Sequence, residues 1–377
     1  MLLRGGLITA ALVVVAFAAF LFAVEHPTTR GPLRCWIEES FYEQNWAPAP
    51  DGTPIVEAVQ TTEPVIDLCD AADDPAIWVS DDKPNDVFVL GTNKQSSVNV
   101  YDLSGALVSR TGEIGAPNNV DLRAHDGRII VMASDKDDAQ VEAFTLDPQS
   151  GDLRHLPGAP FPAEAEDEFY GACLFDAGDA LFAFTTDKSG LVVQYEMSFQ
   201  PNTSPLRKVR ELRVPTQPEG CVVDDANAVL FVGEEDVGIW RFDADTDGST
   251  RGLLIAETGA DGPLVADVEG LAIYTGETAE EGFLIASSQG DNTFAVFDRA
   301  APHAFRGRFQ VSFNGEIIGD TDGLDVTSTP IGAVYPRGLL VIQDGFIRDS
   351  RGERRNQRFA YVSWADVEIA LGLEVSD

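Results

Sequence analysis

Basic residues are scarce in this sequence. Its 377 residues include 26 lysines and arginines against 62 aspartates and glutamates, and the formal net charge is −36. So large a negative excess argues against a surface for nucleic acid or for an anionic membrane, because both carry charge of the same sign. Most of the acids are expected to be solvated surface residues. Only acids that recur in a pattern therefore indicate a site.

Several signatures of catalysis and of helical structure are absent. The chain has no Arg-His-Gly motif, no cysteine in a phosphate-cradling loop and no Gly-x-Ser-x-Gly elbow. Covalent catalysis of phosphate-ester chemistry is thereby disfavoured, and water activated by a metal remains among the hydrolytic options. No long stretch has convincing helical periodicity, and 34 glycines and 21 prolines punctuate the chain throughout. The sequence predicts an all-β protein.

The N-terminus carries an apolar run without charge. Arg4 precedes this run, which extends from Leu7 to Val24. Such a segment is typical of an export signal or a membrane anchor, and no clear small-x-small cleavage site follows it. We therefore predict a signal peptide or an N-terminal membrane anchor over residues 1–26, with the protein exported to the periplasm or the extracellular space. Residues 27–64 are rich in proline and turn formers and should form a tether with a possible closing strand.

Cysteine and histidine are rare, with four of each. The sequence contains no Cys-x-x-Cys and its histidines are scattered, which disfavours a zinc site. An even number of cysteines in an exported chain allows disulfides. We expect Cys35 to pair with Cys69 and Cys173 with Cys221, although the offsets of the second pair from their neighbouring glycines differ by one residue.

Six short motifs, most of them acidic, recur at steps of about 45 to 53 residues, and each leads into a β-forming run. They are Asp73–Trp78, Asn119–Leu122, Tyr170–Cys173, Glu219–Val222, Asp267–Ala272 and Asp320–Asp325. This period is typical of a propeller with one blade per repeat. Residues 65–377 are therefore predicted to form one six-bladed β-propeller of four-stranded antiparallel sheets. To close the ring, residues near Ile55 to Val59 should pair beside the last strands, around Arg358 to Trp364.

Equivalent positions of successive blades surround one channel, so the recurrent acids should meet at one mouth of it. Three second strands end in a polar residue and a lysine, namely Asn93-Lys94, Asp135-Lys136 and Asp187-Lys188, whereas later blades present acids such as Glu234-Glu235-Asp236. A mouth divided in this way suits an anion held by lysines and bridged to the acids through hard cations. Oxygen ligands in this number favour calcium. The alternative is that these acids cap ordinary β-turns, since Asp-Gly and Glu-Gly are turn signals.

These motifs resemble those of the β-propeller phytases. The resemblance covers about Asp73 to Trp364 in order, and its motifs are DDPAIWV from Asp73, NNVDLR from Asn118, DVEGLAIY from Asp267, SSQG from Ser287 and DTDGLDV from Asp320, with Tyr170-Gly171, Glu219-Gly220 and Glu234-Glu235-Asp236. It implies a calcium-dependent phosphomonoesterase that hydrolyses myo-inositol hexakisphosphate with metal-activated water at the propeller mouth.

The resemblance also implies roles for individual residues. Ligands of several Ca²⁺ ions would be Tyr170, Glu219, Glu235, Asp267, Glu269 and Gln289, with Asp73 and Asp74 at a neighbouring ion. Catalytic roles would fall to Tyr170, Glu219, Glu235 and Asp322, and phosphate binding to Lys94, Lys136 and Lys188. Lys136 stands where the family commonly has arginine. Phe346-Ile347-Arg348 stands where the family offers further oxygen ligands, which puts a calcium at that edge in doubt.

Two other functions stay open at this level. One is a non-catalytic, calcium-dependent propeller that binds inositol phosphates, and the other is a propeller lactonase with a single calcium. The lysines and the paired acids argue against the lactonase. The expected partners are inositol phosphates, with phytate taken as its calcium complex, and no nucleic acid. We expect a monomer, which the N-terminal segment would tether to a membrane if that segment is an anchor.

Overall fold

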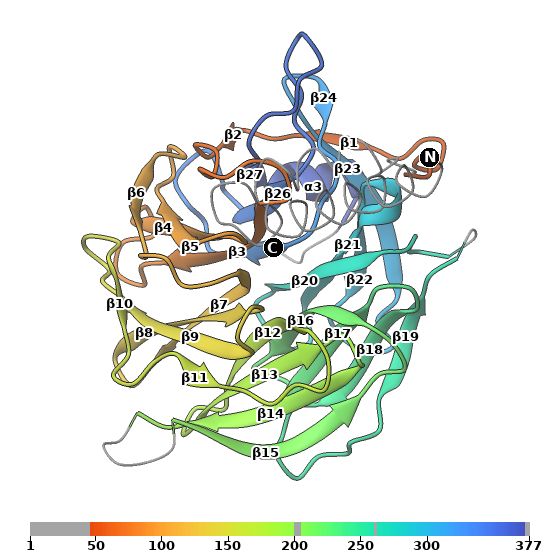
Figure 1. Ribbon diagram of the computed structural model, residues 1–377. Helices are drawn as coiled ribbons and strands as arrows, with labels where there is room; N and C mark the ends of the chain where they lie inside the picture. Colours follow the sequence, from red (N-terminus) through yellow and green to blue (C-terminus); the bar gives the residue numbers. More distant parts are fainter. Residues whose placement is uncertain (1–45, 200–204, 260–261, 374–377) are drawn as a thin grey trace, which may run out of the picture.

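The computed structural model describes residues 46–199, 205–259 and 262–373. Six small sheets surround a central axis, and the chain passes from one to the next in sequence order (Figure 1). Within each sheet the strands run from the axis outward, so that β3, β7, β12, β16, β20 and β25 are innermost. The prediction of an all-β, six-bladed propeller is confirmed.

The first four blades are consecutive runs of strands. Blade 1 contains β3 (Ala72–Val79), β4 (Val87–Asn93), β5 (Ser97–Tyr101) and β6 (Leu107–Arg110). Blade 2 contains β7 (Pro117–His125), β8 (Arg128–Asp135), β9 (Gln140–Leu146), β10 (Leu153–His155) and the short β11 (Phe161–Pro162). Blade 3 contains β12 (Phe169–Asp176), β13 (Leu181–Asp187), β14 (Leu191–Met197) and β15 (Leu206–Arg213). Blade 4 contains β16 (Pro218–Asp224), β17 (Val229–Glu234), β18 (Gly238–Asp243) and β19 (Leu253–Glu257).

The last two blades take strands from the beginning of the chain. Blade 5 contains β20 (Val268–Thr275), β21 (Gly282–Ser288), β22 (Thr293–Asp298) and β23 (Phe305–Phe313), extended by β1 (Ile55–Glu57) and β24 (Glu316–Ile317). Blade 6 contains β25 (Leu324–Thr327), β26 (Leu339–Asp344), β27 (Arg358–Ser363) and β2 (Gln60–Thr61). A 3-10 turn, η1 (Gln289–Asp291), follows β21, and α3 (Trp364–Leu371) follows β27.

An early strand closes the ring beside the final blade, but not at the residues that we predicted. Gln60 and Thr61 pair antiparallel with Tyr361 and Ala360. Ile55–Glu57 instead pairs parallel with β23 of blade 5. The expected partner of Ile55 to Val59 was therefore wrong for most of that segment, although the Val59 amide does donate to the Tyr361 carbonyl at 2.8 Å. The chain follows the outer edge of blade 5 before it reaches blade 6.

The apolar core is divided among the interfaces between blades. The described residues form six buried clusters, and each cluster joins two adjacent blades. Strand β8, for example, sends Ile130 and Met132 toward blade 3 and Val131 and Ala133 toward blade 1, because successive side chains of a strand point to opposite faces. Each sheet is buried on both faces, so the ring holds its inner strands firmly in place.

One predicted disulfide is confirmed. Cys173 and Cys221 are bonded and join the innermost strands of blades 3 and 4. The other predicted pair cannot be compared, because Cys35 lies outside the described residues, as does the predicted signal or anchor at residues 1–26. Among the residues that are described, no helix has the length and apolar character to cross a bilayer.

Candidate metal and phosphate site

A β-bulge occurs at the same place in five of the innermost strands. The ladder between the first and second strands shifts register between Ala72 and Pro75 in blade 1 and at equivalent points in blades 2 to 5. Inside the shifts lie Asp73-Asp74, Asn118-Asn119, Tyr170-Gly171, Glu219-Gly220 and Glu269-Gly270. In blade 6, Asp322-Gly323 directly precedes β25. Because a bulge re-aims side chains, this ring of bulges turns one polar residue from each blade toward a common mouth.

Two of the glycines in these pairs are required by close packing between blades. A Cβ atom on Gly171 would lie 1.9 Å from the carbonyl oxygen of Glu219, and one on Gly220 would lie 2.2 Å from that of Glu269. Only glycine allows the neighbouring backbone to approach so closely. The interpretation of Glu219-Gly220 as a turn signal is therefore wrong, since both residues lie within β16.

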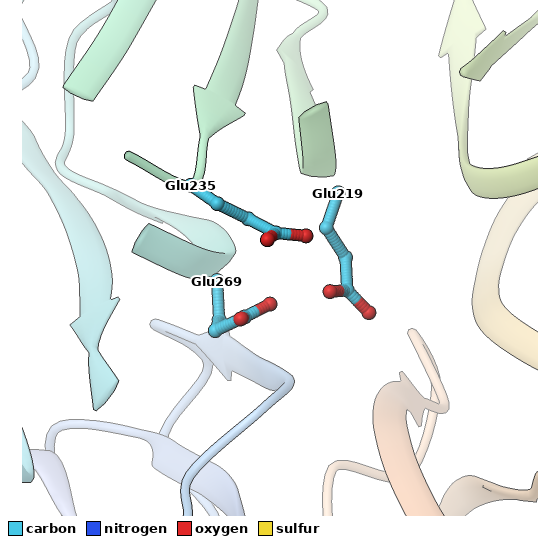
Figure 2. A group of neighbouring side chains, drawn as sticks. All are labelled: Glu219, Glu235 and Glu269. Atoms are coloured by element: carbon cyan, nitrogen blue, oxygen red, sulfur yellow. The ribbon is translucent and has the colours of Figure 1, made fainter. Parts of the chain in front are cut away.

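Glu219, Glu235 and Glu269 point toward one another at this mouth (Figure 2). Each can place one carboxylate oxygen within 4.8 Å of those of the other two. Glu219 comes from the bulge of β16, Glu235 follows β17, and Glu269 lies in the bulge of β20. Asn118 of blade 2 completes the group by donating its side-chain amide to Glu219 Oε1 at 2.9 Å.

The three carboxylates repel one another in the absence of a cation. Burial, with the charge of Glu219 in addition, raises the pKa of Glu269 well above its usual range. The same two causes raise the pKa of Glu235 to about 7. Burial also acts on Glu219, but hydrogen bonding with Glu269 and the charge of Lys94 outweigh it and lower its pKa. A divalent cation among the three would relieve this repulsion.

The donor set fits a hard cation. The three carboxylates offer only oxygen, and three buried oxygens around the mouth find no hydrogen-bond partner among the described residues: Asp73 Oδ2, Asn118 Oδ1 and Glu269 Oε2. Buried polar atoms are normally paired, so oxygens left over at one place indicate a missing partner. Calcium takes six to eight such ligands in flexible geometry.

Lys94 lies in a second group of acids, where blade 1 meets blade 6. Its ammonium lies 2.6 Å from Asp70 Oδ1, 3.0 Å from Asp73 Oδ1 and 2.9 Å from Asp322 Oδ2. Burial opposes the charge on Lys94, but these acids outweigh it and raise the lysine's pKa well above its usual range. Lys94 therefore offsets part of the negative charge in this half of the mouth.

Tyr170 contacts the two other predicted lysines with its ring. The ammonium of Lys188 is 4.5 Å from the centre of the Tyr170 ring and that of Lys136 is 5.1 Å from it. Both distances are those of a cation–π contact. Burial and the positive charge of Lys94 lower the pKa of Lys136, whereas burial and the charges of Glu219 and Glu269 raise that of Tyr170.

The remaining predicted residues divide between the mouth and the channel. Gln289 lies at the mouth and donates to Asp322 Oδ1 at 2.6 Å. The Asp267 carbonyl accepts the Gln289 amide at 2.9 Å, and burial with the charges of Asp236 and Glu219 raises the pKa of its carboxyl group. Asp74 is different, because it accepts the Val120 amide at 3.0 Å and lines a cavity of about 380 Å³ farther along the channel. It is not brought to the same cluster as Asp73.

The prediction missed four residues at the mouth. Asn118 occupies the same bulge position as Asp73 and Glu219, so the repeat itself was the signal that could have found it. Asp70 pairs with Lys94 from a segment that has no equivalent in the other blades. Asp320 lies 3.7 Å from Arg354, and that ion pair joins two loops of blade 6. No local motif marks Asp70 or Arg354, whereas Asp320 opens the DTDGLDV motif.

The described residues define a class of protein: a six-bladed propeller that gathers acids and lysines at one mouth. The sequence model of the phytase family matches residues 50–376. The chain is 36% identical to a 3-phytase of Bacillus subtilis (strain 168) over 330 residues, which is 84% of this chain and 85% of that protein. The chain therefore belongs to the phytase family, and the resemblance read from the motifs is confirmed together with the prediction of an enzyme, a phytase.

Comparison with a solved structure supports the fold but not the function. Regucalcin of Agrobacterium tumefaciens, a calcium-binding protein, superposes with a TM-score of 0.52 at 13% sequence identity, over 82% of this chain and 96% of that one. Similarity at this level says that the propeller is shared. It assigns no residue of the mouth.

Proposed function

We propose that this phytase depends on calcium and releases phosphate from myo-inositol hexakisphosphate at the mouth described above. The observation that supports it most directly is the group Glu219, Glu235 and Glu269, whose oxygens approach within 4.8 Å of one another. Lys136 and Lys188 contact the ring of Tyr170 at the same mouth. Membership of the family favours this function over a non-catalytic binding propeller and over a lactonase.

The metal ligands would come from both halves of the mouth. The proposed set is Tyr170, Glu219, Glu235, Asp267, Glu269 and Gln289, with Asp73 at a neighbouring ion. Asp74 was expected beside Asp73, but its carboxylate accepts the Val120 amide in the channel and is left out of the set. Bound calcium would lower the pKa of a water molecule and neutralise charge on the phosphate oxygens. The unpartnered oxygens of Asp73, Asn118 and Glu269 are the observation that favours ions here.

The lysines would hold the phosphate. Lys136 and Lys188 contact the Tyr170 ring, which keeps two ammonium groups near the mouth. Charge from these groups would stabilise the equatorial oxygens during an in-line displacement by water. Lys94 would contribute as well, but its ammonium is held by Asp70, Asp73 and Asp322 in the absence of substrate.

Asp322 is the candidate to hold a proton for the leaving oxygen of the inositol ring. Burial raises its pKa well above the usual range; Lys94 opposes this shift, and Asp73 and Asp70 add to it. Its two oxygens accept hydrogen bonds from Gln289 and Lys94, so the carboxyl group is fixed in place. A fixed acid of raised pKa is suited to general acid catalysis.

Export and a monomeric state are further proposals. The apolar run from Leu7 to Val24 supports export, with a signal peptide and an anchor as the two forms it would take. The substrate would then be phytate outside the cytoplasm, taken as its calcium complex.

The test is phosphate release from inositol hexakisphosphate by protein stripped with a chelator, before and after calcium is added back. We expect no release from the stripped protein and recovery on addition of calcium. Equal release in excess chelator would rule out the calcium dependence. Binding without release would favour the non-catalytic propeller, and activity on lactones alone would favour the lactonase.

A further inference from the structure

One of the five bulges at the mouth carries a residue to which no role has been assigned. The first residue of each bulge, taken in blade order, is Asp73, Asn118, Tyr170, Glu219 or Glu269. Four of these belong to the proposed metal-binding set, and Asn118 of blade 2 does not. Because a bulge re-aims the side chain that it carries, an equivalent position predicts an equivalent direction. The repeat therefore places Asn118 where a further ligand is expected.

The amide of Asn118 is buried and only half used. The residue is 0% exposed, and its Nδ2 donates two hydrogen bonds. Its Oδ1 is buried as well but finds no hydrogen-bond partner among the described residues. Buried polar atoms are normally paired, so an oxygen left over at this depth indicates a ligand.

The two hydrogen bonds fix the orientation of the amide. Nδ2 donates to Glu219 Oε1 at 2.9 Å and to Asn119 Oδ1 at 3.0 Å. Both partners are acceptors, and an amide nitrogen has only two hydrogens to give. A reversed amide would set oxygen against oxygen at both contacts. Oδ1 is therefore held facing away from these two acceptors.

The contact with Glu219 places this oxygen at the metal-binding group. Asn118 lies in β7 of blade 2 and Glu219 in β16 of blade 4, so their hydrogen bond crosses the mouth past blade 3. The oxygen and nitrogen of one amide share a carbon, so Oδ1 also lies close to the Glu219 carboxylate. That carboxylate belongs to the three whose oxygens approach within 4.8 Å of one another. The unpartnered oxygen is thus beside the group that fits a cation.

The chemistry of an amide oxygen limits what its partner can be. It only accepts, so the partner is a hydrogen-bond donor or a cation. Phosphate groups present acceptor oxygens themselves and are unsuitable. The ammonium of Lys94 is already shared among Asp70, Asp73 and Asp322. Calcium remains, since it accepts neutral amide oxygens of asparagine alongside carboxylates.

We propose that Asn118 Oδ1 is a direct ligand of the cation that Glu219 binds, while Nδ2 holds the Glu219 carboxylate in position for it. The identity of the cation as calcium rests on the proposed function. Only an amide performs both tasks from one side chain. Aspartate would offer an oxygen but could not donate to Glu219, and alanine would do neither.

The decisive measurement is calorimetric titration of calcium into the full chain after chelator stripping, without substrate. In Asn118→Ala we expect the affinity of at least one calcium site to fall roughly tenfold or more, because even loss of an outer-shell partner typically costs 10- to 100-fold. Asn118→Asp retains an oxygen at this position and should bind calcium at least as tightly as the original. Unchanged affinity in the Ala variant would overturn the proposal.

The Asp variant separates ligation from hydrogen bonding. If Asn118 served only as a donor to Glu219, the Asp variant would lose calcium affinity as the Ala variant does, since a carboxylate cannot donate and repels its neighbour. An equal loss in both variants would therefore overturn ligation by Oδ1.

Melting temperatures give a second, independent readout. Without calcium, Asn118→Asp should melt below the original, because two carboxylates would face each other where an amide now donates. Bound calcium should remove that repulsion, so the rise in Tm on adding calcium should be larger for this variant than for the original. A smaller rise would contradict a ligand at this position.

The matched control adds the same charge away from the mouth. Asn85 is exposed in the loop that joins β3 to β4, at the end of blade 1 opposite to Asp73. We expect Asn85→Asp to change neither the calcium affinity nor the calcium-dependent rise in Tm. A rise in Tm as large as that of Asn118→Asp would show that added charge alone matters and would overturn the proposal.

These titrations also distinguish this proposal from the proposed function. They contain no substrate, so a protein that binds calcium but releases no phosphate would refute the proposed function and leave the role of Asn118 to be decided by the variants. If the original protein took up no calcium at all, both proposals would fail.

Discussion

The two halves of the mouth are both acidic, but they differ in whether the protein supplies a cation to the acids. Around Asp70, Asp73 and Asp322 the protein supplies its own cation, since Lys94 lies within 3.0 Å of all three. Around Glu219, Glu235 and Glu269 the described residues place no lysine or arginine in an ion pair with these carboxylates. One half is partly neutralised by its own lysine, whereas no lysine or arginine among the described residues pairs with the carboxylates of the other half.

This difference explains how one cleft can serve cation and anion together. An acidic site without any internal cation would attract metal but repel phosphate, whereas a site neutralised throughout would bind little metal. Under the proposed function, dividing the mouth would let the lysines face the phosphate while the glutamates hold the ions. Tyr170 marks the boundary between the two halves of the mouth. Its ring contacts two lysines, and burial together with the charges of two glutamates raises the pKa of its hydroxyl group.

Removing the internal cation should strongly destabilise the half of the mouth around Lys94. In Lys94→Met the carboxylates of Asp70, Asp73 and Asp322 would face one another without a partner. Loss of one member of a buried ion pair typically costs about 3 to 5 kcal/mol. We expect chemical denaturation to show a loss of this size without calcium and a smaller one with calcium, because an ion can replace the ammonium. A Lys83→Met control, at an exposed surface pair, should change little.

Removing one charge from the metal-binding half should act on turnover more than on folding. Glu219→Gln keeps the shape of the side chain but leaves two carboxylates to hold the ion. We expect kcat to fall roughly 100-fold or more, since the change removes charge directly at the reaction centre. Without calcium the stability of the variant should change little, because relief of the repulsion on Glu235 and Glu269 is offset by loss of the interactions that lower the pKa of Glu219. Glu257→Gln, on an outer strand, is the matched control. Undiminished phosphate release would contradict the assignment of Glu219.

The pH dependence of stability should distinguish metal-free from calcium-loaded protein. Burial and neighbouring charge raise the pKa of Glu235 to about 7 and that of Glu269 well above its usual range. Between the ordinary carboxyl pKa and these raised values, the folded protein binds more protons than the unfolded chain. The free energy of unfolding therefore falls as pH rises through this interval. We expect the Tm of metal-free protein to be lower at pH 8 than at pH 5 by about 5 °C.

Calcium should remove that trend, since bound ions stabilise the ionised carboxylates. Scanning calorimetry at both pH values, with calcium and with chelator, measures the effect. A metal-free Tm that rises between pH 5 and pH 8 would show that the glutamates do not dominate.

The repeat predicted the fold well because it reports on packing between neighbouring blades. Each motif overlaps the innermost strand of its blade, so the number of blades and the common mouth followed from spacing alone. The closing strand was harder to place, because β2 has only two residues, Gln60 and Thr61, and carries no alternation that could fix its register. The chain's path along β23 depends on tertiary contact rather than on local pattern.

The site was predictable only where its residues share a repeated position. Asp73, Glu219 and Glu269 lie in equivalent bulges, whereas Asp70 and the Asp320–Arg354 pair belong to loops found in single blades. The sequence repeat also could not predict the direction in which a side chain points. Adjacent residues Asp73 and Asp74 take different paths, one to Lys94 and the other to the Val120 amide, because the bulge turns them apart.

The last prediction concerns Tyr170, where the two halves meet. Its ring and its hydroxyl have separable jobs: the ring contacts Lys136 and Lys188, and the hydroxyl is the proposed metal ligand. Tyr170→Phe keeps the ring, so we expect the affinity for calcium to weaken while KM for substrate stays within about twofold. Tyr170→Leu removes both, and loss of the two cation–π contacts should raise KM roughly fivefold beyond the Phe variant, at about 0.5 to 1 kcal/mol for each contact.

Steady-state kinetics at saturating calcium, with calcium affinity measured by calorimetry, separate the two effects. If Phe and Leu at position 170 give the same KM, the ring does not position the lysines and the boundary lies elsewhere. If the Phe variant loses substrate affinity but no calcium affinity, the hydroxyl contacts phosphate rather than metal. Either outcome would show that Tyr170 is not the boundary between the half of the mouth that contains lysines and the half that binds metal ions.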